Sequence, residues 1–167
     1  MIKVTSLAIL MLAMSTITAA QAEEKNHARS IKITWQNATK FAYEITFSGK
    51  NNCVIDAGRK NTFTVPPRTD SSTTIQIDER CGDEAEISWG LVTHNDSDER
   101  IAASVTYAEL KMGASWQILV SAFSPHDNIL FEAFFLPDKI NCFKSTVMVN
   151  NINNVTSVVI NLIHTGH

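Results

Sequence analysis

The feature that most constrains the fold of this chain is a strict alternation of apolar and polar residues. Between residues 31 and 35, Ile and Trp alternate with Lys and Thr, and between residues 41 and 47, Phe, Tyr and Ile alternate with Ala, Glu and Thr. A period of two is that of a β-strand with one buried face, because successive side chains point to opposite sides. The two runs flank a turn at 37–39, so they predict a β-hairpin.

The same period recurs along most of the chain. Further runs of this kind predict strands at 54–55, 62–65, 73–77, 85–93, 101–107, 116–123, 129–136, 143–149 and 155–163. The prolines Pro66 and Pro67 lack the backbone N–H that a strand ladder needs, so they predict a longer loop. About nine or ten short strands with polar turns predict an all-β protein, an antiparallel β-sandwich with jelly-roll or Greek-key-like connections.

Little helix is expected. The stretch from Tyr107 to Met112 is the one place where composition favours a helical turn, because Ala, Glu, Leu, Lys and Met are good helix formers. Gly113 follows directly and is suited to the C-terminal cap of such a turn.

The N-terminus has the three parts of a cleavable signal peptide. Lys3 provides a positive charge, an apolar stretch runs from Val4 to Ala20, and small residues precede a charged segment that begins at Glu23. The sequence therefore predicts a signal peptide over 1–22, cleaved between Ala22 and Glu23. The remaining residues, 23–167, are expected to form a single domain in the periplasm or outside the cell.

Charge argues against nucleic acid as a partner. Removal of Lys3 with the leader leaves 13 basic against 17 acidic residues, and the basic residues are scattered along the chain. Nucleic-acid binding needs a concentrated positive surface that neutralises phosphates. No segment after the leader has the length and apolarity of a membrane-spanning helix.

Three cysteines remain after the leader, and an oxidising compartment favours closure of one pair. Cys53 and Cys81 lie beside turn-like stretches, whereas Cys142 lies within a predicted strand. We therefore expect a Cys53–Cys81 disulfide, with Cys142 left over as a buried thiol or, alternatively, for intermolecular pairing. None of the spacings matches a zinc site.

The polar segment from His94 to Arg100 is a candidate calcium site. Asp96, Asp98 and Glu99 carry the hard oxygen ligands that calcium binds, although the segment lacks the glycine and spaced terminal Glu of a known calcium loop. A solvated turn accounts for the same residues. We expect no other metal and no cofactor.

Catalytic chemistry has two sources of candidates. The acidic residues around Cys81, from Asp78 to Glu86, are of the type that acts on glycosidic bonds, but a charged strand end that prevents edge pairing explains them too. A hydrolase site would otherwise have to be assembled from dispersed residues, namely His94, Asp96, His126, Asp127 and Glu132. The sequence contains no recognised catalytic motif, so an enzyme is not indicated.

Aromatic residues define the last candidate surface. Trp35, Trp89 and Trp116 each occupy the apolar phase of a strand and are expected in the core. The segment 129–136 is apolar in both phases, which means either burial on both sides or one side exposed to a partner or lipid. In the second case Leu130, Phe134 and Leu136 form the exposed surface.

Three Asn-x-Ser/Thr sequons, which begin at Asn37, Asn95 and Asn154, all fall in predicted turns, so these residues are expected at the surface.

The sequence thus predicts an exported, non-enzymatic β-sandwich that binds a surface, glycan, lipid or protein partner outside the cytoplasm. A secreted hydrolase and a membrane-active or pore-forming protein are the alternatives.

Overall fold

The alternation at the start of the domain produces strand β1, Ala28–Asn37, in which Ile31, Ile33 and Trp35 are fully buried. A computed structural model describes residues 27–82, 84–123, 129–136, 140–142 and 146–164. The predicted signal peptide, residues 1–22, lies outside the described residues.

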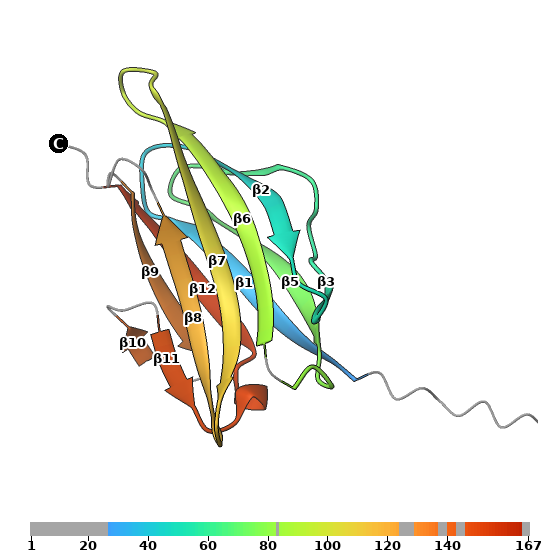
Figure 1. Cartoon of the computed structure of the whole chain (residues 1–167). Helices are drawn as coiled ribbons and strands as arrows, with labels where there is room; N and C mark the ends of the chain where they lie inside the picture. Colours follow the sequence, from blue (N-terminus) through green and yellow to red (C-terminus); the bar gives the residue numbers. More distant parts are fainter. Residues whose placement is uncertain (1–26, 83, 124–128, 137–139, 143–145, 165–167) are drawn as a thin grey trace, which may run out of the picture.

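The described strands form two six-stranded sheets packed face to face (Figure 1). The first sheet has the strand order β10-β9-β12-β1-β5-β3 and the second the order β11-β8-β7-β6-β2-β4. The bounds of the elements after β1 are β2 Tyr43–Lys50, β3 Val54–Asp56, β4 Phe63–Val65, β5 Asp70–Asp78, β6 Glu84–His94, β7 Arg100–Met112, β8 Ser115–Phe123, β9 Ile129–Leu136, β10 Ile140–Cys142, β11 Thr146–Val149, the 3₁₀ turn η1 Ile152–Asn154 and β12 Ser157–His164.

This architecture confirms the prediction of an all-β sandwich. Between the described strands every pairing is antiparallel except one, since β1 and β12 run parallel, with Lys32 opposite Ser157 and Asn37 opposite Leu162. The two strands lie side by side in the first sheet although they come from opposite ends of the domain (Figure 1). The first and last described strands are therefore neighbours within the first sheet.

The predicted hairpin between the first two strands is wrong. β1 lies between β5 and β12 in the first sheet, whereas β2 lies between β4 and β6 in the second. The short connection after Asn37 crosses from one sheet to the other, so the apolar faces of β1 and β2 meet across the core. Alternation identifies the buried face of a strand but not the sheet that contains it.

The predicted helical turn at 107–112 is also wrong, because these residues continue β7. Residues 107–110 are paired with both β6 and β8, and residues 111–112 with β8. Pairing on both sides outweighs an intrinsic helix preference of a few tenths of a kcal/mol per residue. Gly113, with a φ of 66°, instead opens the tight turn into β8. Among the described residues no helix is long and apolar enough to span a membrane.

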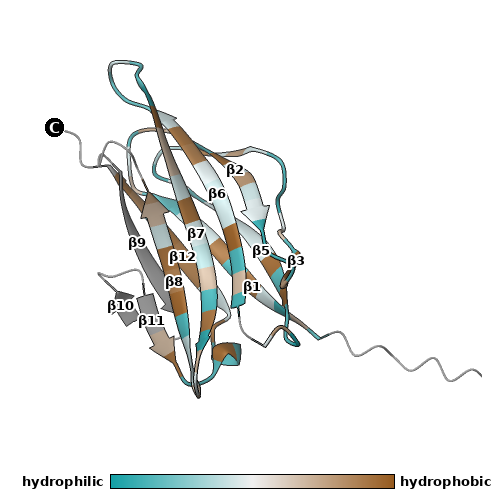
Figure 2. Cartoon of the chain, viewed as in Figure 1, coloured by the Kyte–Doolittle hydropathy of each residue, from teal (hydrophilic) through white to brown (hydrophobic). Residues whose placement is uncertain are grey.

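The core lies between the sheets and is centred on two tryptophans. Trp35 of β1 and Trp89 of β6 are fully buried, and their rings meet edge to face with centroids 5.2 Å apart. This geometry suits aromatic pairs because the positive edge of one ring meets the negative face of the other. Hydrophobic bands recur along β6, β7 and β8 (Figure 2). Trp116 is partly buried against the core.

The predicted disulfide is confirmed. Cys53, just before β3, is bonded to Cys81, just after β5, with a Cα–Cα distance of 5.6 Å. The bridge joins two residues that are 28 positions apart in the sequence. It holds the short edge strand β3 against the end of β5. Such a bond limits the conformational freedom of the unfolded chain, and it is compatible with an oxidising compartment.

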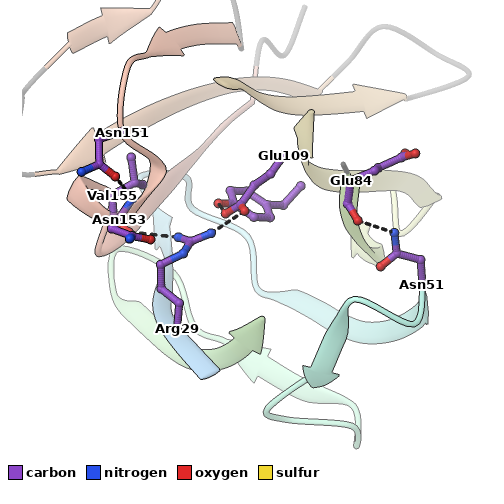
Figure 3. Close-up of polar contacts among 8 residues, drawn as sticks. Arg29, Asn51, Glu84, Glu109, Asn151, Asn153 and Val155 are labelled. Atoms are coloured by element: carbon purple, nitrogen blue, oxygen red, sulfur yellow. Dashed lines mark hydrogen bonds and ion pairs between the residues drawn. The ribbon is translucent and has the colours of Figure 1, made fainter. Parts of the chain in front are cut away.

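A buried ion pair also joins the two sheets. The guanidinium of Arg29, at the start of β1, contacts the carboxylate of Glu109 in β7, and the side chains are 9% and 2% exposed (Figure 3). The hydroxyl of Tyr107 donates to the other carboxylate oxygen. Burial, and then the charge of Glu109, raises the pKa of Tyr107 well above its ordinary value. Arg29 also donates to the carbonyl of Val155, 3.4 Å away, and so ties η1 to the same cluster.

Removal of one partner from this pair should cost far more than removal of the whole cluster. Glu109→Leu leaves the Arg29 charge buried without its partner, so we expect a loss of about 3–5 kcal/mol in the free energy of unfolding. The triple variant Arg29→Met/Tyr107→Phe/Glu109→Leu leaves no buried charge without a partner and removes only the long hydrogen bond to the Val155 carbonyl, so it should lose much less. Urea denaturation of both variants checks this, and equal losses would contradict it.

Candidate functional site

A pocket lies at one end of the sandwich, beside the Pro-Pro loop. It has a volume of about 330 Å³, and the described residues that line it come from the end of β1 and the loop before β5, namely Gln36, Asn37, Ala38, Arg68, Thr69 and Asp70. This volume is at the lower end of the range for small-ligand sites. Gln36 and Asp70 are directly opposite each other on β1 and β5, which places their exposed side chains within reach of one ligand group.

The floor of the pocket is the side chain of Asn37, which is 1% exposed. Its Nδ2 group lies within hydrogen-bond distance of three carbonyl oxygens, those of Phe41 at 2.7 Å, Val65 at 3.1 Å and Pro66 at 3.0 Å. Its Oδ1 atom accepts from the backbone N–H and the hydroxyl of Thr39, at 3.0 and 2.7 Å. One side chain thus fixes the β1–β2 connection to the loop that follows β4.

The rim of the pocket contains a strained residue. Arg68 has a φ of 56°, in the left-handed region that normally requires Gly or Asn. The loop is held in this form by two hydrogen bonds, from the Asn37 N–H to the Thr69 carbonyl at 2.8 Å and from the Thr69 hydroxyl to the Pro66 carbonyl at 2.9 Å. A residue other than glycine in this backbone conformation is uncommon, so its side chain is a candidate for a functional role.

The pocket presents complementary hydrogen-bonding groups. The guanidinium of Arg68 donates, the carboxylate of Asp70 accepts, and the amide of Gln36 does both. Among the described lining residues Asp70 is the only carboxylate, and none is a His or Cys. The set therefore offers hydrogen-bonding groups of both kinds to a polar ligand.

The expectation that the sequon at Asn37 lies at the surface is wrong. Asn37 is the last residue of β1, and its Nδ2 group is enclosed by the three carbonyl oxygens. The same Asn-x-Thr spacing that suggested an exposed turn serves here to satisfy buried backbone groups, since Thr39 bonds both to Asn37 and to the carbonyl of Phe41.

The candidate calcium residues lie in the turn between β6 and β7. Asp96 forms an exposed ion pair with Lys40, while Glu99 accepts from the Asn95 amide at 3.1 Å. Asn95 Oδ1 in turn accepts from the backbone of Ser97 and Glu99, and Asp98 has a φ of 60°. In the described part of the chain no group of three or more His, Cys, Asp or Glu side chains is placed to hold a metal ion. The calcium site remains a prediction without geometric support.

The acidic cluster around Cys81 is organised by a local ion pair. Both carboxylate oxygens of Asp78 accept from the guanidinium of Arg80, at 2.9 and 2.7 Å. These hydrogen bonds, with that from the Arg80 backbone N–H, lower the pKa of Asp78 from 3.8 to about 2. A group that is ionised throughout the physiological range cannot act as a general acid.

The remaining predicted site residues are only partly described. His94 is exposed at the end of β6, opposite Arg100 in β7. His126 and Asp127 lie outside the described residues, as does the side chain of Glu132. No convergence of the dispersed hydrolase candidates is therefore observed among the groups that the structure describes.

The predicted partner surface lies on β9, whose backbone pairs with β12 on one side and β10 on the other. Leu130, Phe134 and Leu136 are opposite Ile163, Val159 and Ser157 in the register. Their side chains, and that of Cys142 in β10, are outside the described residues, so this surface stays a prediction.

The sequence analysis did not identify the pocket, because its residues are distant in the chain and belong to no motif. The nearest signal was the Pro66-Pro67 pair followed by Arg68, which marks a constrained loop but not the strand that it meets. No model of a known protein family matches the chain, and no curated protein is significantly similar to it in sequence.

Substitution of Asn37 tests whether its amide holds the pocket together. Asn37→Ala leaves the buried Val65 carbonyl without this donor and the Thr39 N–H without its acceptor, so we expect a loss of about 3 kcal/mol in the free energy of unfolding. Asn37→Asp conserves size but directs a carboxylate at three carbonyl oxygens, and it should cost at least as much. Chemical denaturation measures both losses. An Asp variant as stable as the parent protein would show that the amide group is not required.

Proposed function

We propose that this protein is an exported, non-enzymatic binding protein that takes a polar, hydroxyl-rich ligand, such as the terminal sugar of a glycan, into the pocket beside the Pro-Pro loop. One observation carries this proposal: Arg68 is kept in a strained backbone conformation on the rim of a pocket whose floor is fixed by the buried Asn37. A preformed site of this kind lowers the ordering cost of binding.

The chemistry of the rim supports a hydroxyl-rich ligand. Neighbouring sugar hydroxyls each donate and accept, and the pocket offers a donor in Arg68, an acceptor in Asp70 and both in Gln36. Guanidinium and carboxylate groups form the stronger, charge-assisted hydrogen bonds. Export is supported by the signal-peptide pattern, and the Cys53–Cys81 disulfide is compatible with it.

The absence of catalysis is part of the proposal. The lining residue Thr69 donates its hydroxyl hydrogen to the Pro66 carbonyl and not to a side-chain base. Activation of a hydroxyl nucleophile requires such a base. Turnover of an ester, glycoside or peptide substrate by the purified protein, abolished by Asp70→Asn, would reverse this assignment.

Arg68→Gly separates binding from stability. Glycine relieves the left-handed strain at this position but makes the unfolded chain more flexible, so the free energy of unfolding should change by no more than about 1 kcal/mol. Loss of the guanidinium should reduce ligand binding at least tenfold, since a hydrogen bond to a charged group contributes about 1.5–3 kcal/mol. A glycan array identifies the ligand, and calorimetry measures the affinity.

Asp98→Gly is the matched control, because Asp98 is the other described residue with a side chain and a positive φ, and it lies in the β6–β7 turn. It should leave ligand affinity unchanged. If Arg68→Gly binds as tightly as the parent protein, the pocket is not the binding site.

A further inference from the structure

A buried oxygen atom without a hydrogen-bond partner lies close to the pocket. It is Oδ1 of Asn161 in β12, one of four such polar atoms among the described residues, and the other three belong to aromatic side chains of the core. Asn161 differs from them because its neighbours Ile160 and Leu162 are buried, so its own side chain is on the outer side of the sheet, where it is partly exposed. Buried polar atoms normally have a partner, so this exception requires an explanation.

Asn161 extends a row of polar side chains that begins in the pocket. It is opposite Gln36 of β1, and Gln36 is opposite Asp70 of β5. Gln36 and Asp70 line the pocket and are exposed on the same outer face of the sheet. β12 lies beside β1 (Figure 1), and its Leu162 carbonyl accepts from the N–H of the lining residue Ala38 at 3.3 Å. We call Asp70, Gln36 and Asn161 the polar row.

The surroundings of Asn161 suit one ring of a sugar. Val159 and Ile163, two positions to either side on the same face of β12, are half-buried and apolar. Ligand sites typically combine such apolar side chains with a few polar groups that fix orientation. The χ2 rotation of Asn is broad and roughly two-fold, so the amide can turn its Oδ1 atom outward to accept from a ligand.

The length of the polar row indicates the size of the ligand. Neighbouring strands are about 4.8 Å apart, so the backbone positions of Asp70 and Asn161 are separated by about 10 Å. This span is longer than one hexose ring and within the length of two linked rings. A ligand that contacts both ends of the row must therefore extend beyond a single sugar.

We propose that the ligand of the pocket is a chain of at least two sugars and that Asn161 determines specificity for the second one. The terminal ring lies beside Arg68 and Asp70, and the second ring lies over Gln36 and Asn161 and donates a hydroxyl or acetamido N–H to Oδ1. This inference rests on the proposed function of the pocket and adds a second subsite to it.

Stability measurements separate this role of Asn161 from a structural one. Asn161→Leu keeps nearly the same shape but removes an acceptor that has no partner in the free protein. Replacement of an unsatisfied polar group by an apolar one of similar shape is neutral or stabilising. We therefore expect a melting temperature equal to or above that of the parent protein. A lower melting temperature would show that the amide serves the fold and would overturn the inference.

The binding test is calorimetry with cellobiose, maltose, lactose and N,N′-diacetylchitobiose, each compared with the methyl glycoside of its terminal sugar. At least one disaccharide should bind about tenfold more tightly than its methyl glycoside. Asn161→Leu should reduce this advantage about three- to tenfold, the effect of one lost hydrogen bond, and should leave methyl glycoside binding unchanged. Arg68→Gly should weaken the binding of both.

Gln76→Leu is the matched control. Gln76 is another partly exposed amide on the outer face of the first sheet, but it lies six positions along β5 from Asp70, about 20 Å from the pocket. This variant should bind every saccharide as the parent protein does.

The outcomes distinguish this inference from the proposed function. If methyl glycosides bind but no disaccharide binds more tightly, or if Asn161→Leu retains the full advantage, the second subsite is overturned and the pocket proposal stands. If Asn161→Leu weakens methyl glycosides and disaccharides equally, Asn161 belongs to the pocket itself and the second subsite is again overturned. If none of the saccharides binds, both proposals fail.

Discussion

The side-chain amide of Asn37 fixes the segment in which the chain crosses from the first sheet to the second. It lies at the end of β1, under the connection that crosses to β2, and it binds the carbonyls of Phe41, Val65 and Pro66. The Val65 carbonyl is a buried acceptor that needs a donor because water is excluded from it, and the other two are partly buried. Because one amide serves all three, the crossover, the Pro-Pro loop and the pocket between them share a single fixed geometry.

The same strand attaches the first sheet to the second along its whole length. At its start Arg29 forms the ion pair with Glu109, towards its end Trp35 packs on Trp89, and its last residue, Asn37, provides the polar network. The apolar contact contributes the most stabilisation, since burial of large side chains is the main favourable term in folding. The two polar contacts are costly if left incomplete, so they fix the relative position of the sheets.

Alternation along the sequence was sufficient to predict the all-β class, most strand positions and the buried tryptophans, because a half-buried strand requires a period of two. The placement of strands was not predictable in the same way. The 31–35 and 41–47 runs have ideal hairpin spacing but enter different sheets, and the parallel β1–β12 pair joins residues more than a hundred positions apart. The Cys53–Cys81 bridge followed from turn-like neighbours, whereas the pocket depends on Asn37, whose burial is a tertiary property.

The pocket suits recognition of a ligand that hydrogen-bonds without a large net charge, in keeping with the scattered basic residues of the sequence. The proposed binding function depends most directly on whether the pocket takes up a sugar. An NMR titration of the ¹⁵N-labelled protein with methyl glycosides of neutral hexoses and N-acetylhexosamines measures this. We predict saturable shifts in the backbone amides of Ala38, Thr69 and Asp70, which line the pocket. The absence of shifts at these amides with every glycoside would contradict the account.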